Sequence, residues 1–280
     1  MDLATHSEPS RVTPSRRANL PSAFAFDLAT LSVLWRRDIV RFFRERFRIV
    51  GALAQPLMFW LVLGSGMAST FRLPGSLRVG YPEYFFPGVV LMVVLFTSIF
   101  ATMSVIEDRH QGFLHAVLAG PGSRTAVVLG KCLGSTSIAL GQAALFMALA
   151  PTAGFSWHQI DWLYALSVLA LASVALTTLG FAVAWWLDST QSYHVVMSLL
   201  LIPMWVVSGA MFPASGALGW VMRFDPMAYA TTALRRALYS GRVPDGMLPA
   251  WSHASADVGV LAAFAVVSLG LALAAGHRRR

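Results

Sequence analysis

Six long apolar runs, each free of Asp, Glu and Arg, constrain this chain more than any other feature of its sequence. A helix of about 20 apolar residues is long enough to cross the hydrocarbon core of a bilayer. Helices also satisfy their own backbone hydrogen bonds in lipid. The sequence therefore predicts an all-α membrane protein with six transmembrane helices. The predicted spans are residues 49–69, 84–106, 127–150, 162–187, 193–211 and 258–276.

The composition agrees with a protein embedded in lipid. Apolar residues make up 56% of the 280 residues and charged residues only 12%, which excludes an ordinary soluble domain. The single cysteine, Cys132, allows no internal disulfide and no cysteine-based metal cluster. Its neighbours predict a buried, unreactive thiol.

The basic residues indicate how the chain is oriented. The net charge is +8, and fifteen of the 21 Lys and Arg residues fall in the cytoplasm if both termini lie there. Because cytoplasmic loops are enriched in Lys and Arg, we expect a multi-pass protein of the inner cell membrane with both termini cytoplasmic. Lys131, near the start of the third run, is expected to extend its ammonium group back to the interface. No soluble basic module is present to bind nucleic acid.

The chain before the first run divides into two segments. Residues 1–22 lack the apolar core of a signal peptide and predict a disordered cytoplasmic tail. Residues 23–48 place large apolar side chains near helical spacing among arginines, which predicts an amphipathic interfacial helix whose arginines meet anionic membrane lipid. The alternative is a helix packed on a partner protein. Residues 49–276 then form one six-span domain, and residues 277–280 form a basic cytoplasmic end.

A charged amphipathic segment, residues 107–121, separates the second and third runs; it is called the 107–121 patch below. A short polar helix with an apolar side, held between two spans, lies at a membrane face, where a second protein can bind it. The alternative is an amphipathic turn that rests on lipid. The candidate binding residues are Glu107, Asp108, Arg109, Gly112, Phe113, Leu114, Val117, Leu118 and Pro121.

The spans lack the groups that membrane chemistry needs. Carriers coupled to protons or sodium usually place ionisable residues near the bilayer midplane. An intramembrane protease needs paired aspartates, Ser with His, or an H-E-x-x-H helix. Gly130-Lys131 lacks the earlier glycine and the hydroxyl residue of a phosphate loop, and His110 and His115 fall on different faces of a helix. We therefore expect no catalytic residue, metal or cofactor in this chain, and an energy source in another subunit.

Small residues and prolines predict how the spans pack. Gly130, Gly134 and Gly141 share one side of the third span and allow close helix packing. That packing is expected within the chain, with a dimer seam as the alternative. Pro56, Pro87 and Pro203 interrupt the first, second and fifth spans, where they permit kinks.

The segment between the fifth and sixth runs is external in this topology. Its apolar start predicts a re-entrant hairpin at the mouth of a pathway, because irregular backbone at membrane depth must be covered by protein or line a cavity. A plain external loop is the alternative. The residues expected at this external gate are Phe212, Pro213, Asp225, Pro226, Tyr229 and Arg235.

Two motifs together resemble a known family. An E-D-R-x-x-G-x-L stretch that begins at Glu107, followed by Pro121, Ser123-Arg124 and Leu129-Gly130-Lys131, resembles the permease subunit of type-2 ABC exporters. Ser208-Gly209-Ala210-Met211-Phe212-Pro213, then Asp225-Pro226-Met227-Ala228-Tyr229 and Leu234-Arg235, resembles the late signature of that family.

The resemblance runs from about residue 28 onward. It is nearest to the daunorubicin-type drug exporters, with lipo-oligosaccharide and O-antigen exporters more distant. Asp225 stands where the family often has Asn, and His110 and Gln111 stand where the drug exporters commonly carry Glu.

This resemblance implies a permease homodimer that binds two copies of a cytoplasmic ABC ATPase, which would hold the ATP and Mg. The 107–121 patch would be the coupling helix, and the cargo would be a hydrophobic or amphipathic molecule, drug-like or lipid-like, moved outward. Aromatic and Met side chains of three spans would line its pathway, since they tolerate varied apolar ligands, unless they simply face lipid or other helices. They are Phe59, Trp60, Phe96, Phe100, Met103, Met204 and Trp205.

Three other functions stay open at this level. The chain could be a glycolipid or polysaccharide exporter permease of the same superfamily. It could instead be a membrane scaffold that recruits an ATPase without transporting anything. A secondary carrier is the third alternative.

Overall fold

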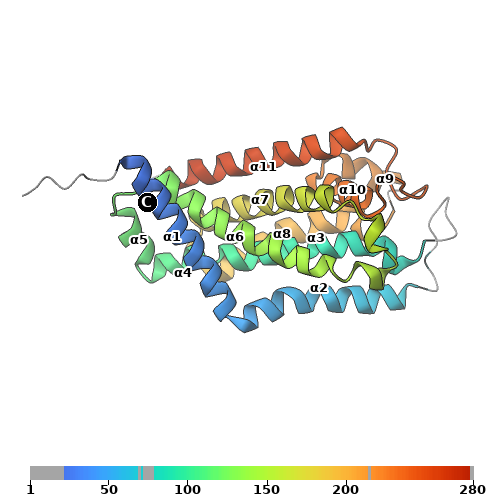
Figure 1. Ribbon diagram of the computed structural model, residues 1–280, viewed down its shortest axis with the longest axis horizontal. Coiled ribbons are helices and arrows are strands. Elements are labelled where there is room, and N and C mark those ends of the chain that lie inside the picture. Colours follow the sequence, from blue (N-terminus) through green and yellow to red (C-terminus); the bar gives the residue numbers. More distant parts are fainter. Residues whose placement is uncertain (1–21, 69–70, 72–78, 214–215, 278–280) are drawn as a thin grey trace, which may run out of the picture.

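The computed structural model describes residues 22–68, 71, 79–213 and 216–277, and its regular elements in these ranges are all helical. Long helices run side by side along one bundle, and α1 crosses them diagonally at one end (Figure 1). The all-helical prediction is therefore confirmed for this part of the chain. The predicted disordered tail, apart from residue 22, and residues 278–280 of the basic end lie outside the described residues.

The elements follow the predicted runs closely. Short connecting elements are η1 (Ala150–Ala153), η2 (Trp157–Gln159), η3 (Val206–Ala210, a π-helical turn that continues α8), α9 (Gly216–Val221) and η4 (Met222–Phe224). The remaining helices are α1 (Ala23–Arg44), α2 (Arg46–Gly66), α3 (Tyr81–Thr102), α4 (Ser104–His110), α5 (Phe113–Leu118), α6 (Arg124–Met147), α7 (Trp162–Trp186), α8 (Thr190–Trp205), α10 (Pro226–Leu238) and α11 (Ala254–His277).

Five segments are long and apolar enough to cross a membrane: Ile49–Gly66, Tyr81–His110, Trp162–Trp186, Thr190–Ala210 and Ala254–His277. The third predicted span corresponds to α6, whose 24 residues give it comparable length. It carries Lys131, Gln142 and several hydroxyl side chains, so its hydropathy is lower. The count of six crossings therefore stays a prediction.

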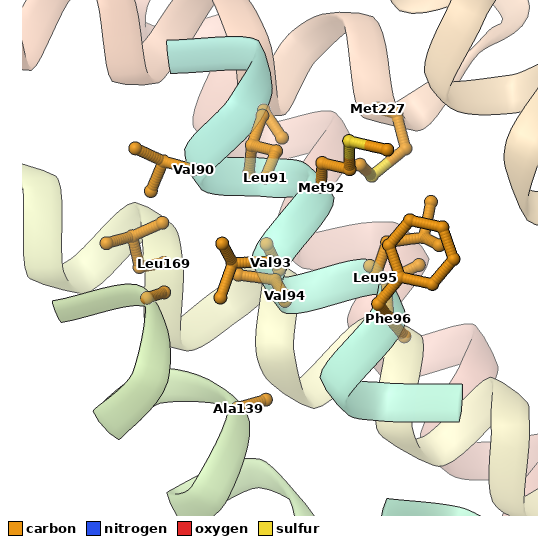
Figure 2. Close-up of a cluster of buried hydrophobic side chains, with 14 of the residues drawn as sticks. Val90, Leu91, Met92, Val93, Val94, Leu95, Phe96, Ala139, Leu169 and Met227 are labelled. Carbon is orange, nitrogen blue, oxygen red and sulfur yellow. The ribbon is translucent and has the colours of Figure 1, made fainter. Parts of the chain in front are cut away.

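Helix α3 forms the centre of the bundle. Its apolar residues surround the whole helix, as expected for a helix buried on every side, and most of its side chains are fully buried. Figure 2 shows Val90 to Phe96 of α3 among Ala139 of α6, Leu169 of α7 and Met227 of α10.

Polar side chains fix how the helices are rotated against α3. Thr97 donates to Gln142 of α6, and the Thr102 and Tyr193 hydroxyls hydrogen bond between α3 and α8. Trp205 Nε1 donates to the Gly88 carbonyl at 2.7 Å. Hydrogen bonds of this kind hold helices together where lipid is as apolar as the side chains themselves.

The predicted interfacial helix ends earlier than residue 48. Glu45, with φ −90° and ψ 71°, leaves the helical region after Arg44, and Arg46 starts α2. The chain therefore bends at Glu45, and residues 46–48 belong to the first apolar helix.

Helix α1 packs along α6 of its own chain. A Cβ atom at Gly130 would lie 3.1 Å from Leu31 Cα, and one at Gly134 would lie 3.1 Å from Asp38 Cβ. Gly130 and Gly134 thus permit α1 and α6 to approach each other closely. For these two glycines, the prediction of packing within the chain is confirmed. Gly141 has no atom within 4 Å of the same position.

Candidate functional site

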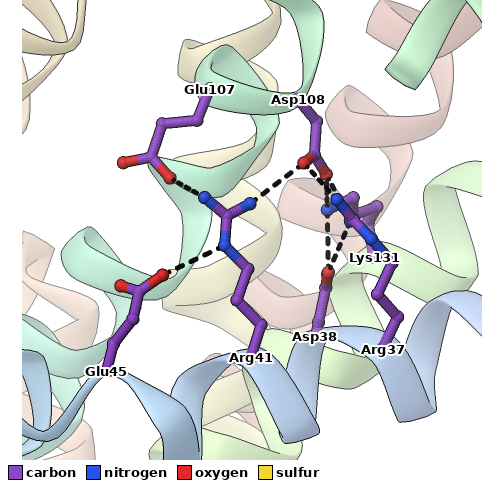
Figure 3. Close-up of polar contacts among 7 residues, drawn as sticks. All are labelled: Arg37, Asp38, Arg41, Glu45, Glu107, Asp108 and Lys131. Carbon is purple, nitrogen blue, oxygen red and sulfur yellow. Dashed lines mark hydrogen bonds and ion pairs between the residues drawn. The ribbon is translucent and has the colours of Figure 1, made fainter. Parts of the chain in front are cut away.

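Asp108 of α4 is the centre of a buried ionic cluster. Its carboxylate is 0% exposed and accepts two hydrogen bonds from the Arg37 guanidinium, at 2.8 and 2.7 Å. Arg41 Nη1 donates a third at 3.0 Å, and the Lys131 ammonium donates a fourth. Two parallel bonds from one guanidinium fix direction as well as distance. Asp108 therefore ties α4 to both α1 and α6 (Figure 3).

Lys131 does not extend to the interface, so that expectation was wrong. Its side chain is 1% exposed, and its Nζ donates to Asp38 Oδ1 at 3.0 Å as well as to Asp108. The reason is that α1 covers α6 at this level and brings a carboxylate with it. A buried ammonium group is tolerated when it is paired and hydrogen bonded.

The remaining members extend the cluster along α1. Arg41 Nη2 lies 2.7 Å from Glu107 Oε2, and Arg41 Nε lies 3.1 Å from Glu45 Oε1. Burial raises the pKa of Asp38, although Lys131 opposes that effect. The hydrogen bond to Asp108 raises the pKa of Arg37. The ionic cluster comprises Arg37, Asp38, Arg41, Glu45, Glu107, Asp108 and Lys131.

The prediction of a lipid-facing helix missed the four members of the cluster that lie in residues 23–48, namely Arg37, Asp38, Arg41 and Glu45. Asp38 did carry a signal. It lies four residues after Leu34 and four before Phe42, so a carboxylate interrupts the buried apolar side of α1. A carboxylate at such a position requires a cationic partner, and Lys131 supplies it.

Arg109 anchors the same segment to a third helix. Its guanidinium donates to the carbonyls of Ala184, Trp185 and Leu187 at 3.0 to 3.2 Å, and to Asp188 at 2.9 Å. The last carbonyls of a helix lack intrahelical partners and carry partial negative charge. Arg109 thus caps the carboxyl end of α7.

Helix α5 turns outward after Gly112, whose φ of +73° favours glycine. Leu114 is 3% exposed and packs into the bundle, and the Arg37 guanidinium lies 3.7 Å from the Phe113 ring centroid. Val117 and Leu118 are half-buried. The outward face, exposed at the end of the bundle (Figure 1), consists of Gln111, Gly112, His115, Ala116, Ala119, Gly120 and Pro121.

The structure thus divides the 107–121 patch into an anchored half and an exposed half. Glu107, Asp108, Arg109 and Leu114 contact other helices of this chain, whereas Gly112 and Pro121 are exposed. Whether any of these residues binds a second protein stays a prediction. Beside them, a cavity of about 330 Å³ opens between α5 and the end of α7, lined by Arg109, Leu114, His115, Leu118, Ala119, Arg124, Trp185 and Asp188.

Three of the seven predicted pathway residues meet at one cavity. Phe59, Phe96 and Trp205 line a space of about 130 Å³ between α2, α3 and α8, together with Gln55, Met92, Leu95, Ile202, Val206 and Met211. The other four lie outside it. Trp60 is 8% exposed and donates to the Pro82 carbonyl; Phe100 packs on the ring of His194; Met103 and Met204 are half-buried.

At the opposite end from α5, Arg235 is buried within the predicted external gate. It is 1% exposed, and its guanidinium donates to the Gly209 carbonyl at 2.8 Å and to the Met247 carbonyl at 3.0 Å. Tyr84 donates to the same Gly209 carbonyl at 2.9 Å, with its ring 4.2 Å from the guanidinium. Gly209 and Tyr84 were not among the predicted gate residues, although Gly209 belongs to the late signature of the family.

The other gate residues are spread over the turn before α10. Asp225 caps α10, because its Oδ1 accepts from the Met227 amide at 2.9 Å, while Oδ2 has no partner among the described residues. Burial raises the pKa of Asp225 to about 7. Tyr229 donates to the Arg223 carbonyl, Phe212 is exposed, and Pro213 and Pro226 are half-buried. Re-entry into the membrane stays a prediction.

Comparison with known proteins identifies the family. Residues 29–239 match the family described as ABC-2 type transporter. The chain belongs to this family. The sequence-based expectation of a type-2 ABC exporter permease is thereby confirmed.

The relatives include proteins named for nodulation and a permease named for drug resistance. Nodulation protein J of Rhizobium meliloti is 27% identical over 253 residues, covering 88% of this chain and 92% of the relative. Nodulation protein J of Neorhizobium galegae is 27% identical over 221 residues, covering 76% and 82%. The probable doxorubicin resistance ABC transporter permease protein DrrC of Mycobacterium tuberculosis is 22% identical over 251 residues, covering 88% and 90%. These identities do not favour the drug-resistance relative over the nodulation proteins.

Proposed function

We propose that this chain is the membrane-spanning permease subunit of an ABC exporter, driven by ATP hydrolysis in a separate ATPase that binds the exposed face of α5. The observation that carries this proposal is the anchoring of α4. Asp108 links it to α1 and α6, and Arg109 links it to α7. A force applied to α5 would therefore act on three other helices.

The anchoring gives the two halves of the 107–121 patch different roles. The charged residues hold the segment in place, so the ATPase would contact exposed positions such as His115, Ala116 and Ala119. A short helix held by charge-assisted hydrogen bonds transmits displacement without first absorbing it in a flexible loop. We propose that the full assembly is a permease homodimer with two ATPase copies, which hold the ATP and Mg. Each permease would cross the inner membrane six times and keep both termini in the cytoplasm.

The proposed cargo is a hydrophobic or amphipathic molecule, drug-like or lipid-like. The apolar cavity at Phe59, Phe96 and Trp205 supports this class, because aromatic rings and thioethers accept ligands of varied shape. The alternative is a glycolipid or polysaccharide exporter. The similarity to the nodulation proteins keeps this alternative open, because they match as much of the chain as the drug-resistance permease does.

Co-purification with a co-expressed ABC ATPase tests the docking face. Ala116→Asp in α5 and Ala119→Asp at its C-cap place carboxylates on exposed positions, so the fold should persist while the ATPase is lost. Ala29→Asp, at an exposed alanine of α1, is the matched control and should retain the ATPase. Undiminished co-purification of both α5 variants would overturn the proposed docking face.

Transport assays separate the other functions. ATP-dependent accumulation of a dye in inverted vesicles supports an exporter, whereas ATPase binding without accumulation of any tested compound indicates a scaffold. Accumulation that persists without an ATPase and collapses with the proton gradient indicates a secondary carrier.

A further inference from the structure

A second apolar cavity lies outside the site described above, where the chain bends from α1 into α2. It has a volume of about 330 Å³ and opens to the surface of the protein. Its walls come from the last turns of α1, the first turn of α2 and the second half of α6. The lining residues are Ile39, Phe42, Phe43, Ile49, Ser137, Ile138, Gly141, Gln142 and Leu145.

The position of this cavity relative to the membrane follows from α2. Ile49, one of its lining residues, is also the first residue of the apolar segment that is long enough to cross a bilayer. On α2, the cavity therefore lies at the start of the segment that is predicted to cross the hydrocarbon core. Phe43 and Leu145, at 67% and 62% exposed, lie at its opening.

Positive charge and a polar floor accompany the apolar walls. Arg44 and Arg46 flank the bend at Glu45, and both are exposed. Gln142 is 6% exposed, and its Oε1 is taken by Thr97, but its Nε2 has no hydrogen-bond partner among the described residues. A buried donor without an acceptor is unfavourable, so an occupant with an acceptor at this depth would stabilise the site.

We propose that this cavity binds an anionic phospholipid of the cytoplasmic leaflet. One acyl chain occupies the apolar space, an ester carbonyl accepts from Gln142 Nε2, and the phosphate lies against Arg44 and Arg46. The chemistry fits each part: apolar walls suit an acyl chain, and exposed arginines at a membrane surface attract anionic headgroups. The bound lipid would fill the space between α1 and α6 beyond the point where Gly134 holds them together.

The cavity can be filled from within by one substitution. Gly141 forms part of the α6 wall and has no atom within 4 Å of the position of a Cβ atom, so Gly141→Leu starts a side chain in open space at the cavity. Gly270→Leu is the matched control, because Gly270 is an exposed helical glycine of α11 with the same open surroundings.

Native mass spectrometry of the full chain tests the proposal. The protein is released from nanodiscs made of phosphatidylcholine and phosphatidylglycerol, and the retained lipids are counted. The wild type is expected to retain phosphatidylglycerol above its share in the bilayer. Gly141→Leu should lose it, and Gly270→Leu should keep it.

The arginines provide a second measurement that does not alter the cavity. Each charge near a membrane surface contributes a factor of about five in binding, so Arg44→Gln with Arg46→Gln should reduce phosphatidylglycerol retention by more than about tenfold. Arg36→Gln, at an exposed arginine two turns earlier on α1, should leave it unchanged. Equal retention in Gly141→Leu and wild type would overturn the site. Retention of both lipids in bilayer proportion would overturn the anionic assignment.

Discussion

Lys131 Nζ lies 3.0 Å from Asp38 Oδ1, although the residues are 93 positions apart and their side chains are only 1% and 5% exposed. This pair joins α6 to α1 beneath the surface. Asp108 completes it from α4, so the segment that leads into α5 and its proposed docking face rests on a buried arrangement of charges. Such an arrangement is stable only while every charge keeps a partner.

Removal of the central ammonium group should therefore destabilise the fold strongly. Lys131→Met keeps the volume but leaves Asp38 and Asp108 buried with fewer cations. Loss of one partner from a buried pair typically costs about 3–5 kcal/mol, so we expect a large fall in the thermal midpoint in detergent. The double variant Lys131→Met with Asp38→Asn should recover part of the loss. A midpoint for Lys131→Met equal to that of wild type would contradict this role.

Arg109 should be needed for coupling rather than for assembly. Arg109→Gln removes most of the hydrogen bonds to the end of α7 but leaves the exposed face of α5 unchanged. We expect normal co-purification with the ATPase, faster hydrogen exchange at residues 184–188, and reduced ATP-driven transport. Arg109→Lys should give a similar result, because an ammonium group cannot reproduce the planar fork of a guanidinium. Transport at the wild-type rate in both variants would refute the capping argument.

A side chain at Gly209 should destabilise the fold. Its φ is +77°, and a Cβ atom would lie 2.5 Å from Met222 Cε. Gly209→Ala adds backbone strain of about 1 kcal/mol and a steric clash with Met222. Gly241→Ala is the control, since Gly241 has a similar φ but open space. Melting curves should show a larger fall in the thermal midpoint for Gly209→Ala than for Gly241→Ala. Equal falls would contradict the steric clash, because Met222 would then move aside without cost.

Asp225 should make the stability depend on pH in a defined direction. Its folded pKa of about 7 exceeds the ordinary value of 3.8, so between these values the folded state holds a proton that the unfolded state has released. Its contribution is therefore most favourable below pH 4 and is lost as pH rises to 7, by up to about 1.4 kcal/mol per pH unit. Asp225→Asn keeps a capping oxygen and should remove this slope. If the thermal midpoints of wild type and Asp225→Asn changed equally with pH between pH 5 and 8, this role of Asp225 would be contradicted.

The sequence predicted the long helices well because their ends carry local signals. The fourth predicted span, 162–187, differs from α7 by one residue, and Asp161 caps that helix by accepting from the Tyr164 amide. The break at Glu45 was missed, since no Pro or Gly marks it. Hydropathy also could not distinguish helices that face lipid from α3, which faces protein on every side.

The candidate site was only half predictable, for a different reason. The motif at Glu107 located the segment, and its composition showed that it is amphipathic. Which charges point inward depends on partners far along the chain: Asp108 pairs with Arg37, 71 residues earlier, and with Lys131, 23 residues later. Spacing within a motif carries no information about such contacts.

ATP-driven transport in inverted vesicles tests the central claim most directly. Vesicles that contain the chain and its ABC ATPase should accumulate a hydrophobic dye only when ATP is supplied. Ala116→Asp and Ala119→Asp should abolish accumulation, and Ala29→Asp should retain it. Accumulation without ATP, or at an undiminished rate in both α5 variants, would contradict the account of an exporter driven through α5.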